Sequence, residues 1–125
     1  MPKKILIIDD EPDSVEVLKE RLLANNYDVL YAYNSKTGIE KAILQKPDLI
    51  ILDILLPGTN GMEVCQRLKE NPKTKDIPII FLTSLTNDDV VREGLEKGAC
   101  YFVSKPYDPQ GLLFEINMIL KKSRI

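Results

Sequence analysis

The feature that most constrains this chain is a strict alternation of short apolar runs with longer segments whose apolar residues recur at helical spacing. Five apolar runs occur, and one such segment follows each of them. Strands that alternate with helices favour a parallel sheet, because parallel neighbours need a right-handed crossover that is usually helical. The sequence therefore predicts one doubly wound α/β domain, with helices on both faces of the sheet.

The clearest of these runs is Leu49–Leu52, where four consecutive large apolar residues precede Asp53. Such a run is typical of a central parallel strand that is buried on both faces. The predicted strands cover residues 5–8, 27–32, 49–52, 77–82 and 99–103. The predicted helices begin near Pro12, Ser35, Asn60, Thr86 and Asp108, and Gly98 follows the fourth of them.

Composition limits the possible functions. The 125 residues are 44% hydrophobic and 29% charged, which indicates one globular domain. A net charge of −2 without a strong Lys/Arg cluster argues against a direct nucleic-acid partner. Histidine is absent, which excludes Ser-His-Asp hydrolysis and histidine-bound zinc. The N-terminal apolar run is too short for a signal peptide or membrane span, so we expect a soluble, cytoplasmic protein.

The two cysteines, Cys65 and Cys100, each lie inside an apolar pattern and do not form a Cys-x-x-Cys motif. This arrangement favours buried, reduced thiols over a disulfide or a metal pair.

Polar residues follow four of the five predicted strands where each strand ends. Asp9 and Asp10 follow the first strand, Asp53 the third, Thr83 the fourth and Lys105 the fifth. Because parallel strands have their carboxyl ends on one edge of the sheet, these side chains should converge there. In open α/β sheets this is also the edge at which ligands bind.

Three crowded carboxylates repel each other, and one lysine cannot balance them. Oxygen ligands without histidine or thiolate favour Mg²⁺ or a similar hard ion such as Mn²⁺. Together with the Lys105 cation and the Thr83 hydroxyl, they form a cleft suited to a phosphoryl group. Asp53 is then the candidate nucleophile, and its product is an acyl phosphate.

Each of these residues also has a purely structural interpretation. Asp9 and Asp10 could cap the first helix, Thr83 could cap the next helix, and Lys105 could be a surface lysine. Those interpretations are independent of one another, whereas a shared site explains why all five residues fall on one edge. We therefore favour the site.

The motifs Ile7–Pro12, Asp53, Leu56–Gly61, Leu82–Ser84 and Gly98–Tyr107 resemble the receiver domain of two-component response regulators. The resemblance covers essentially the whole chain. It implies a flavodoxin-like (βα)5 fold with strand order 2-1-3-4-5. As given, the chain is expected to be one receiver domain over residues 1–125 without an output domain, as in stand-alone receivers of chemotaxis or phosphorelays, although a receiver excised from a longer chain would look identical.

The resemblance also implies roles for the site residues. Asp53 matches the aspartate that accepts a phosphoryl group from the phosphohistidine of a sensor histidine kinase or a phosphotransfer protein. Asp10 matches the direct Mg²⁺ ligand, Asp9 holds the ion through water, and the backbone carbonyl of Leu55 completes the protein ligands.

Further expectations follow from the resemblance. Thr83 matches the hydroxyl that moves to the phosphoryl oxygen, and Lys105 the cation that pairs with it. Phe102 occupies the position of the aromatic switch residue, although a plain core phenylalanine is the alternative. The Lys105–Pro106 bond is expected to be cis. Phosphorylation should shift the face formed by the fourth helix, fifth strand and fifth helix, and thereby control the binding of a downstream protein that the sequence does not identify.

Two departures from the family pattern carry information. Cys100 and Tyr101 replace an acidic pair that winged-helix regulators use for dimer contacts, so we expect a monomer or weak dimer. Leu55 and Leu85 lie two residues after Asp53 and Thr83, and the resemblance to receivers implies that these side chains lie beside the path of the water that hydrolyses the acyl phosphate. Apolar side chains cannot orient that water, which predicts slow self-dephosphorylation.

Two other classes of protein are alternatives to a phosphorylated receiver. A pseudo-receiver that is never phosphorylated should lack a site residue, and none is missing. An enzyme of this fold would be a dehalogenase-type phosphatase, which needs Asp-x-Asp after a strand, or a flavodoxin, which needs a Ser/Thr/Gly-rich loop. Asp53-Ile54-Leu55 does not fit the first motif, and Asp9-Asp10-Glu11 does not fit the second. We therefore expect a phospho-switch that catalyses only its own phosphoryl transfer and slow dephosphorylation, not an enzyme.

Overall fold

The computed structural model describes residues 2–56, 59–84, 88–98 and 101–122. The expectations for Leu85, Thr86 and Cys100 lie outside these residues. Seven strands and five helices are described, in the order β1 (Lys4–Ile8), α1 (Pro12–Ala24), β2 (Asp28–Ala32), α2 (Ser35–Gln45), β3 (Leu49–Leu52), β4 (Leu55–Leu56), β5 (Thr59–Asn60), α3 (Gly61–Glu70), β6 (Ile79–Thr83), α4 (Asp88–Glu96), β7 (Tyr101–Ser104) and α5 (Pro109–Lys122).

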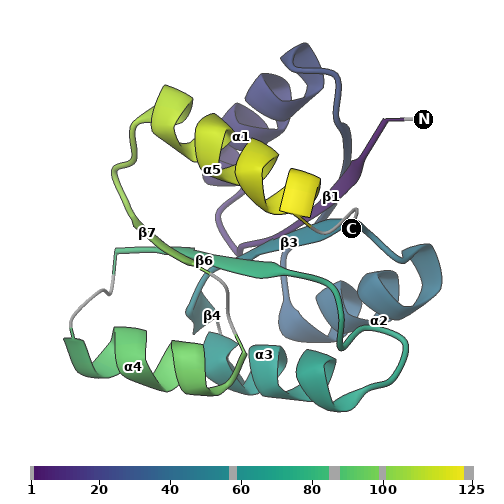
Figure 1. The fold of residues 1–125 in the computed structure, drawn as a ribbon, viewed down its shortest axis with the longest axis vertical. Coiled ribbons are helices and arrows are strands. Elements are labelled where there is room, and N and C mark those ends of the chain that lie inside the picture. Colours follow the sequence, from purple (N-terminus) through teal and green to yellow (C-terminus); the bar gives the residue numbers. More distant parts are fainter. Residues whose placement is uncertain (1, 57–58, 85–87, 99–100, 123–125) are drawn as a thin grey trace.

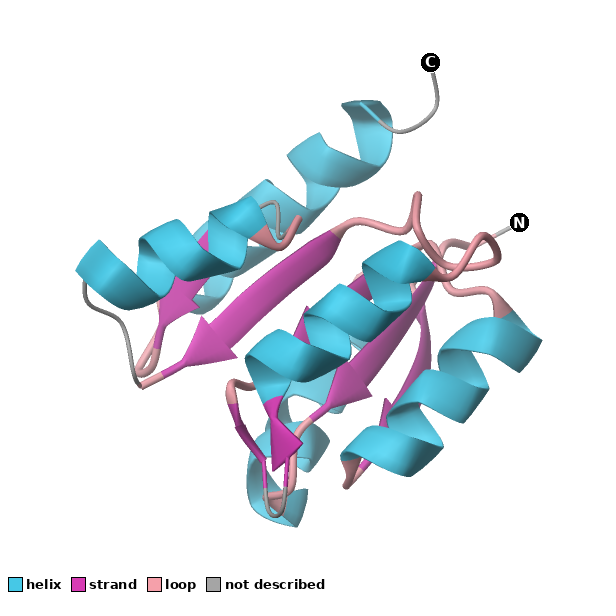
Figure 2. Ribbon diagram, turned by 90° about the horizontal axis from the view of Figure 1, so that it is seen from below, coloured by secondary structure: helices cyan, strands magenta, loops and turns pink. Residues whose placement is uncertain are grey.

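Five of these strands form one parallel sheet in the order β2-β1-β3-β6-β7. Counted within this sheet alone, the order is 2-1-3-4-5, so the predicted flavodoxin-like fold is confirmed. Figure 1 shows α1 and α5 on one face of the sheet and α2, α3 and α4 on the other. Figure 2 shows the strands running in the same direction behind the helices, so their carboxyl ends lie at one edge.

The two faces of the sheet carry two separate cores. Successive residues of the central strands point to opposite faces, and residues of both sets are buried. Leu6 and Ile50 belong to the cluster under α2, α3 and α4, whereas Ile7 and Ile51 belong to the cluster under α1 and α5. This double burial is the physical reason why β1 and β3 read as continuous apolar runs.

The helix ends follow local capping rules, with one correction. The predicted N-cap Ser35 is wrong, because Asn34 caps α2 and its side chain accepts a hydrogen bond from the Thr37 N–H at 2.8 Å. Asn60 caps α3 as expected, and its side chain accepts from the Met62 N–H at 2.8 Å. Gly98 has φ of +101°, the left-handed conformation that glycine adopts after a helix.

The short antiparallel hairpin of β4 and β5 was not predicted. Its strands have two residues each, which is too short for a periodic signal. β6 begins two residues and ends one residue later than expected, and β7 ends one residue later than expected, while its expected start at residues 99–100 lies outside the described residues. The Thr83 and Ser104 backbones consequently belong to the sheet itself.

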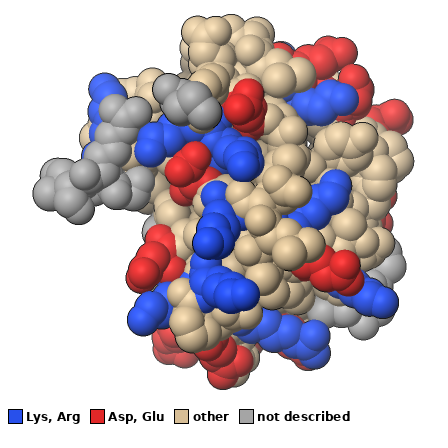
Figure 3. Space-filling view, turned by 90° about the vertical axis from the view of Figure 1, so that its right-hand side faces the viewer, with Lys and Arg blue, Asp and Glu red and all other residues tan. Residues whose placement is uncertain are grey.

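The charged surface includes lysines that bind backbone carbonyls. Figure 3 shows lysine and arginine side chains across the middle of one face of the molecule, with acidic side chains around them. The Lys4 Nζ donates to the Gln45 carbonyl at 3.0 Å, and the Lys69 Nζ donates to the Ile77 carbonyl at 2.7 Å. Within the described residues, no helix combines the length and apolar character needed to cross a bilayer.

Candidate functional site

The backbone brings the ends of β1 and β3 together. The N–H of Asp53 donates to the Ile8 carbonyl at 3.0 Å, and the N–H of Asp9 donates to the Ala32 carbonyl at 3.1 Å. The residues that follow two neighbouring strands are thus held by sheet hydrogen bonds. Asp9 and Asp53 are both buried, with 5% and 6% of their surface exposed. Since burial of a carboxylate is costly without a partner, each of them needs a donor or a cation.

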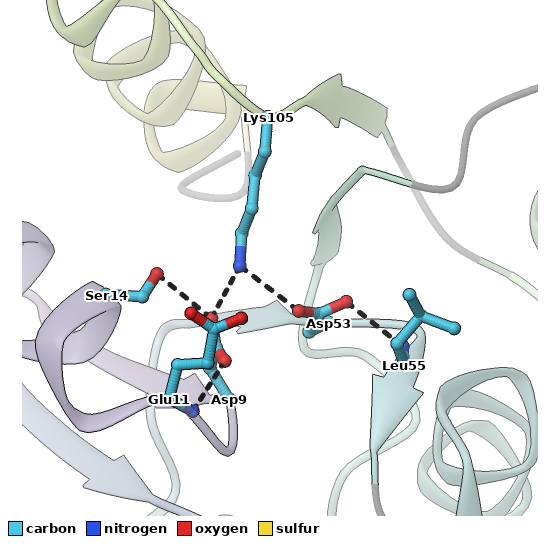
Figure 4. Close-up of polar contacts among 6 residues, drawn as sticks. All are labelled: Asp9, Glu11, Ser14, Asp53, Leu55 and Lys105. Atoms are coloured by element: carbon cyan, nitrogen blue, oxygen red, sulfur yellow. Dashed lines mark hydrogen bonds and ion pairs between the residues drawn. The ribbon is translucent and has the colours of Figure 1, made fainter.

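Lys105 supplies that cation to both carboxylates. Its Nζ lies 2.8 Å from the Asp9 Oδ2 and 3.1 Å from the Asp53 Oδ2, as Figure 4 shows. Burial acts to lower the pKa of Lys105, but the hydrogen bonds and negative charges of the two aspartates outweigh it and raise the pKa above its usual value. Lys105 is therefore a fixed positive charge at neutral pH. Its interpretation as a surface lysine is wrong.

Asp9 is held by two further donors. Its Oδ1 accepts from the Glu11 N–H at 3.0 Å, and its Oδ2 accepts from the Ser14 hydroxyl at 3.2 Å (Figure 4). Ser14 was missed at the sequence level, although a serine in the first helical turn after an acidic pair is a usable signal. Glu11 is the N-cap residue of α1, and it makes no side-chain cap. Asp9 and Asp10 are therefore not the helix caps.

Asp53 is positioned by the turn that follows β3. Its Oδ1 accepts from the Leu55 N–H at 3.0 Å (Figure 4), and Leu55 itself is 52% exposed. The Gly61 N–H donates to the Ile54 carbonyl at 2.8 Å. A Cβ atom on Gly61 would lie 2.4 Å from the Asp53 carbonyl oxygen. Glycine at this position permits the close approach that fixes the Asp53 backbone.

Asp10 completes an acidic group with Asp9 and Asp53. Each of the three offers a carboxylate oxygen, and these oxygens all lie within 4.8 Å of one another. Oxygen-only ligands at this spacing suit a hard divalent cation such as Mg²⁺. Three carboxylates facing one lysine leave an excess of negative charge, which a divalent cation would neutralise. The donor set therefore fits the expected ion.

Thr83 lies on β6 and Phe102 on β7, and Pro106 follows β7 directly after Lys105. Thr83 is the last residue of β6 and is fully buried, and its carbonyl accepts from the Lys105 N–H at 3.0 Å. The idea that Thr83 caps the next helix is wrong, since α4 begins at Asp88. Phe102 packs against the core beneath α3 and α4. The Lys105–Pro106 bond is cis, as expected.

Comparison with known proteins agrees with this geometry. The family model for the response regulator receiver domain matches residues 5–117. The chain is 40% identical over 121 residues to the phosphate regulon transcriptional regulatory protein PhoB of Pseudomonas aeruginosa, covering 97% of this chain and 53% of that protein. It is 38% identical over 125 residues to the alkaline phosphatase synthesis transcriptional regulatory protein PhoP of Bacillus subtilis, covering 100% of this chain and 51% of that one. The chain thus spans about half the length of these curated relatives.

Solved structures resemble it over nearly their full length. A putative response regulator from Chloroflexus aurantiacus superposes with a TM-score of 0.91 at 33% identity, covering 97% of this chain and 99% of the other. A CheY-like receiver domain protein from Methanospirillum hungatei gives 0.94 at 26% identity, covering 99% and 98%. The matched family model spans all five strands of the sheet and most of α5, so the chain belongs to the response regulator receiver domain family.

Proposed function

We propose that this receiver domain accepts a phosphoryl group on Asp53 in two-component or phosphorelay signalling. The single observation that carries the proposal is the Lys105 ammonium, which bridges Asp53 and Asp9 at 3.1 Å and 2.8 Å. A phosphoryl group on the carboxylate carries several negative oxygens, and a fixed cation beside it stabilises that charge. The donor is the phosphohistidine of a sensor histidine kinase or a phosphotransfer protein.

In the transfer step, an Asp53 carboxylate oxygen attacks the phosphorus of the phosphohistidine. The new O–P bond makes an acyl phosphate, and the P–N bond breaks as its electron pair returns to the donor imidazole. Lys105 pairs with the phosphoryl oxygens, and the Thr83 hydroxyl donates to one of them. The Leu55 N–H, already on Asp53 Oδ1, keeps the carboxylate in the orientation for attack.

Asp9, Asp10 and Asp53, together with the backbone carbonyl of Leu55, would hold Mg²⁺ or Mn²⁺. When bound, the ion supplies positive charge for the equatorial phosphoryl oxygens and offsets the repulsion among the carboxylates. Ser14 and the Glu11 N–H contribute by fixing the Asp9 carboxylate.

The output of the phosphorylated state is a change in the face formed by α4, β7 and α5, which alters the binding of a downstream protein. Thr83 ends β6 and Lys105 follows β7, so contacts made by these residues at the phosphoryl group act directly on the two strands next to that face.

The test is incubation with acetyl phosphate and Mg²⁺, followed by intact mass measurement. We expect the wild type to gain one phosphoryl group and Asp53→Asn to gain none. Asp76→Asn is the matched control, because Asp76 is an exposed aspartate outside the acidic group, and it should gain one group like the wild type.

Removal of Mg²⁺ with EDTA should abolish the gain. A wild type that gains no mass with any divalent cation would contradict the proposal and favour a pseudo-receiver, which acts by binding alone.

A further inference from the structure

Phe102 lies where β7 meets α4, against a residue without a side chain. Gly94 of α4 is buried. A Cβ atom on Gly94 would lie 2.2 Å from the Phe102 Cζ and 2.6 Å from its Cε2. Two non-bonded carbon atoms do not approach so closely. While the Phe102 ring keeps its present position, residue 94 therefore cannot carry a side chain. The far end of the ring occupies the space that any other residue at 94 would need.

The ring is also packed from the sheet side. The centroids of the Phe81 and Phe102 rings are 5.0 Å apart with an interplanar angle of 32°. Phe81 is fully buried in β6 and lies opposite Phe102 in the β6–β7 register. The Phe102 ring thus has a fixed neighbour in the sheet as well as one on α4. An added methyl group at 94 can be accommodated only if the ring turns away or α4 moves away from β7.

Both strands involved lead to the candidate site. Thr83 follows Phe81 by two residues on β6, and Lys105 follows Phe102 by three residues along β7 and the loop after it. A displacement of either strand end therefore acts on the pair of phenylalanine rings, and through the Phe102 ring on α4.

We propose that the Phe102 ring packs into the space left by the absent side chain of Gly94. This contact makes the position of α4 and the orientation of the ring depend on each other. Gly94 is a positioning residue for the switch, since it touches neither the phosphoryl acceptor nor the acidic group. The signalling part of this proposal rests on the proposed function, because phosphorylation of Asp53 is the event that would move the ring.

A double-mutant cycle tests the contact without phosphorylation. Gly94→Ala should lower the thermal unfolding midpoint by about 4 °C or more, since overpacking outweighs the gain in helix propensity. In the background of Phe102→Ala, which removes the clashing ring, the same substitution should leave the midpoint unchanged or raise it.

Gly111→Ala is the matched control, because a Cβ on this helical glycine would meet only Asp108 Oδ2 at an ordinary 3.4 Å. It should leave the midpoint unchanged or raise it. An equal loss for Gly94→Ala in both backgrounds would overturn the proposal. If Gly94→Ala does not fold, recovery of folding in the double variant supports the contact, and failure of the double variant to fold rejects it.

The methyl group of Met62 reports the position of the ring. Its Cε lies 3.4 Å from the Cβ position on Gly94, next to the Phe102 ring, so the field of the aromatic ring acts on its NMR signal. With methyl-labelled methionine, the Met62 signal should shift in Gly94→Ala before any phosphorylation. The Met118 signal, from α5, serves as the internal reference and should stay in place.

Acetyl phosphate with Mg²⁺ then tests the coupling to signalling. We expect the wild-type Met62 signal to shift on phosphorylation, and we expect this shift to be lost in Gly94→Ala although intact mass shows that Asp53 still gains its phosphoryl group. A full phosphorylation shift in Gly94→Ala would reject the coupling. Absence of mass gain in every variant would instead reject the proposed function. The unfolding midpoints of the double-mutant cycle would still decide whether the Phe102 ring packs against Gly94.

Discussion

Lys105 and the two aspartates that it contacts are the residues on which the proposed phosphoryl transfer depends. The side chains of Asp9 and Asp53 are 6% and 8% exposed, and that of Lys105 is 19% exposed. The net contribution of a buried ion pair to stability is limited by the cost of desolvation, but loss of one partner leaves an uncompensated buried charge and costs more than loss of a surface pair. In the proposed function, the same lysine therefore neutralises the two carboxylates before phosphorylation and supplies the cation for the phosphoryl group afterwards.

Lys105→Met tests the structural half of this role. Without its ammonium, two buried carboxylates lose their cation, and we expect the free energy of unfolding in EDTA to fall by about 2–4 kcal/mol. Urea denaturation at pH 7 measures it. Lys36→Met removes an exposed lysine from α2 and should change the free energy of unfolding by about 0.5 kcal/mol or less. Equal stability of Lys105→Met and the wild type would mean that the two ion pairs contribute nothing.

Leu55 governs the lifetime of the acyl phosphate in our interpretation. Its N–H binds Asp53 and its side chain is half exposed beside the acceptor, where an apolar group cannot orient the hydrolytic water. Leu55→Asn adds a side-chain amide that can hydrogen-bond this water, and one such bond should raise the dephosphorylation rate about tenfold. The decay of the phosphorylated mass after removal of acetyl phosphate measures the rate.

The control for that experiment is Leu44→Asn, because Leu44 is 77% exposed on α2, away from the acceptor. It should decay at the wild-type rate. If the wild type itself loses its label within seconds in Mg²⁺, the prediction of slow self-dephosphorylation is wrong.

At the scale of the elements, the sequence predicted best those strands that are buried on both faces and those helices whose apolar residues recur at helical spacing. The apolar runs of β1 and β3 and the amphipathic stripes of the helices predicted the sheet and its crossovers. The convergence of Asp9, Asp53 and Lys105 followed from parallel topology alone. The hairpin of β4 and β5 could not be predicted, because two-residue strands have no period and their pairing depends on the turn after Asp53. The Asn34 cap was missed because the adjacent Ser35 is an equally good capping residue by type.

The Phe102 contact with Gly94 was likewise beyond sequence reasoning. A glycine inside a helical pattern has several explanations, and only the packed structure identifies the ring that needs the space.

Tyr27 connects the start of β2 to α5, and its ionisation gives a pH dependence. Its hydroxyl donates to the Asn117 Oδ1 at 3.1 Å, and burial raises the pKa of Tyr27 above its usual value. Below the unfolded-state pKa of about 10, both states keep the proton and the contribution is constant. Above it, the unfolded chain loses the proton first, so the free energy of unfolding falls as pH rises through the folded-state pKa.

We therefore expect urea midpoints to fall as pH rises above about 10, and to fall less steeply in Tyr27→Phe. Tyr107, whose pKa is also raised by burial, should account for part of the remaining slope. At pH 8, Tyr27→Phe should lose about 1 kcal/mol for the missing hydrogen bond. Identical slopes in the two proteins would show that Tyr27 does not contribute.

At the scale of the whole molecule, the acidic group makes the folded state depend on a cation. Folding brings Asp9, Asp10 and Asp53 from distant parts of the chain to within 4.8 Å, whereas the unfolded chain separates them. The repulsion among them is therefore a cost of the folded state alone, and Lys105 directly contacts only two of the three. A divalent cation that binds the folded state and not the unfolded chain must raise the free energy of unfolding by mass action.

Mg²⁺ titration of the stability of the whole domain measures this linkage. We expect the free energy of unfolding to rise by about 2.7 kcal/mol when free Mg²⁺ exceeds its dissociation constant about 100-fold. Asp10→Asn should have two opposite effects: higher stability than the wild type in EDTA, because one repelling charge is gone, and a smaller gain from Mg²⁺, because one ligand is gone. Asp76→Asn keeps the acidic group and should follow the wild type in both conditions. If the gain in stability from Mg²⁺ is equal in Asp10→Asn and the wild type, the stabilising cation binds elsewhere on the molecule. Only a cation bound by the acidic group itself links the higher stability in EDTA to the smaller gain from Mg²⁺.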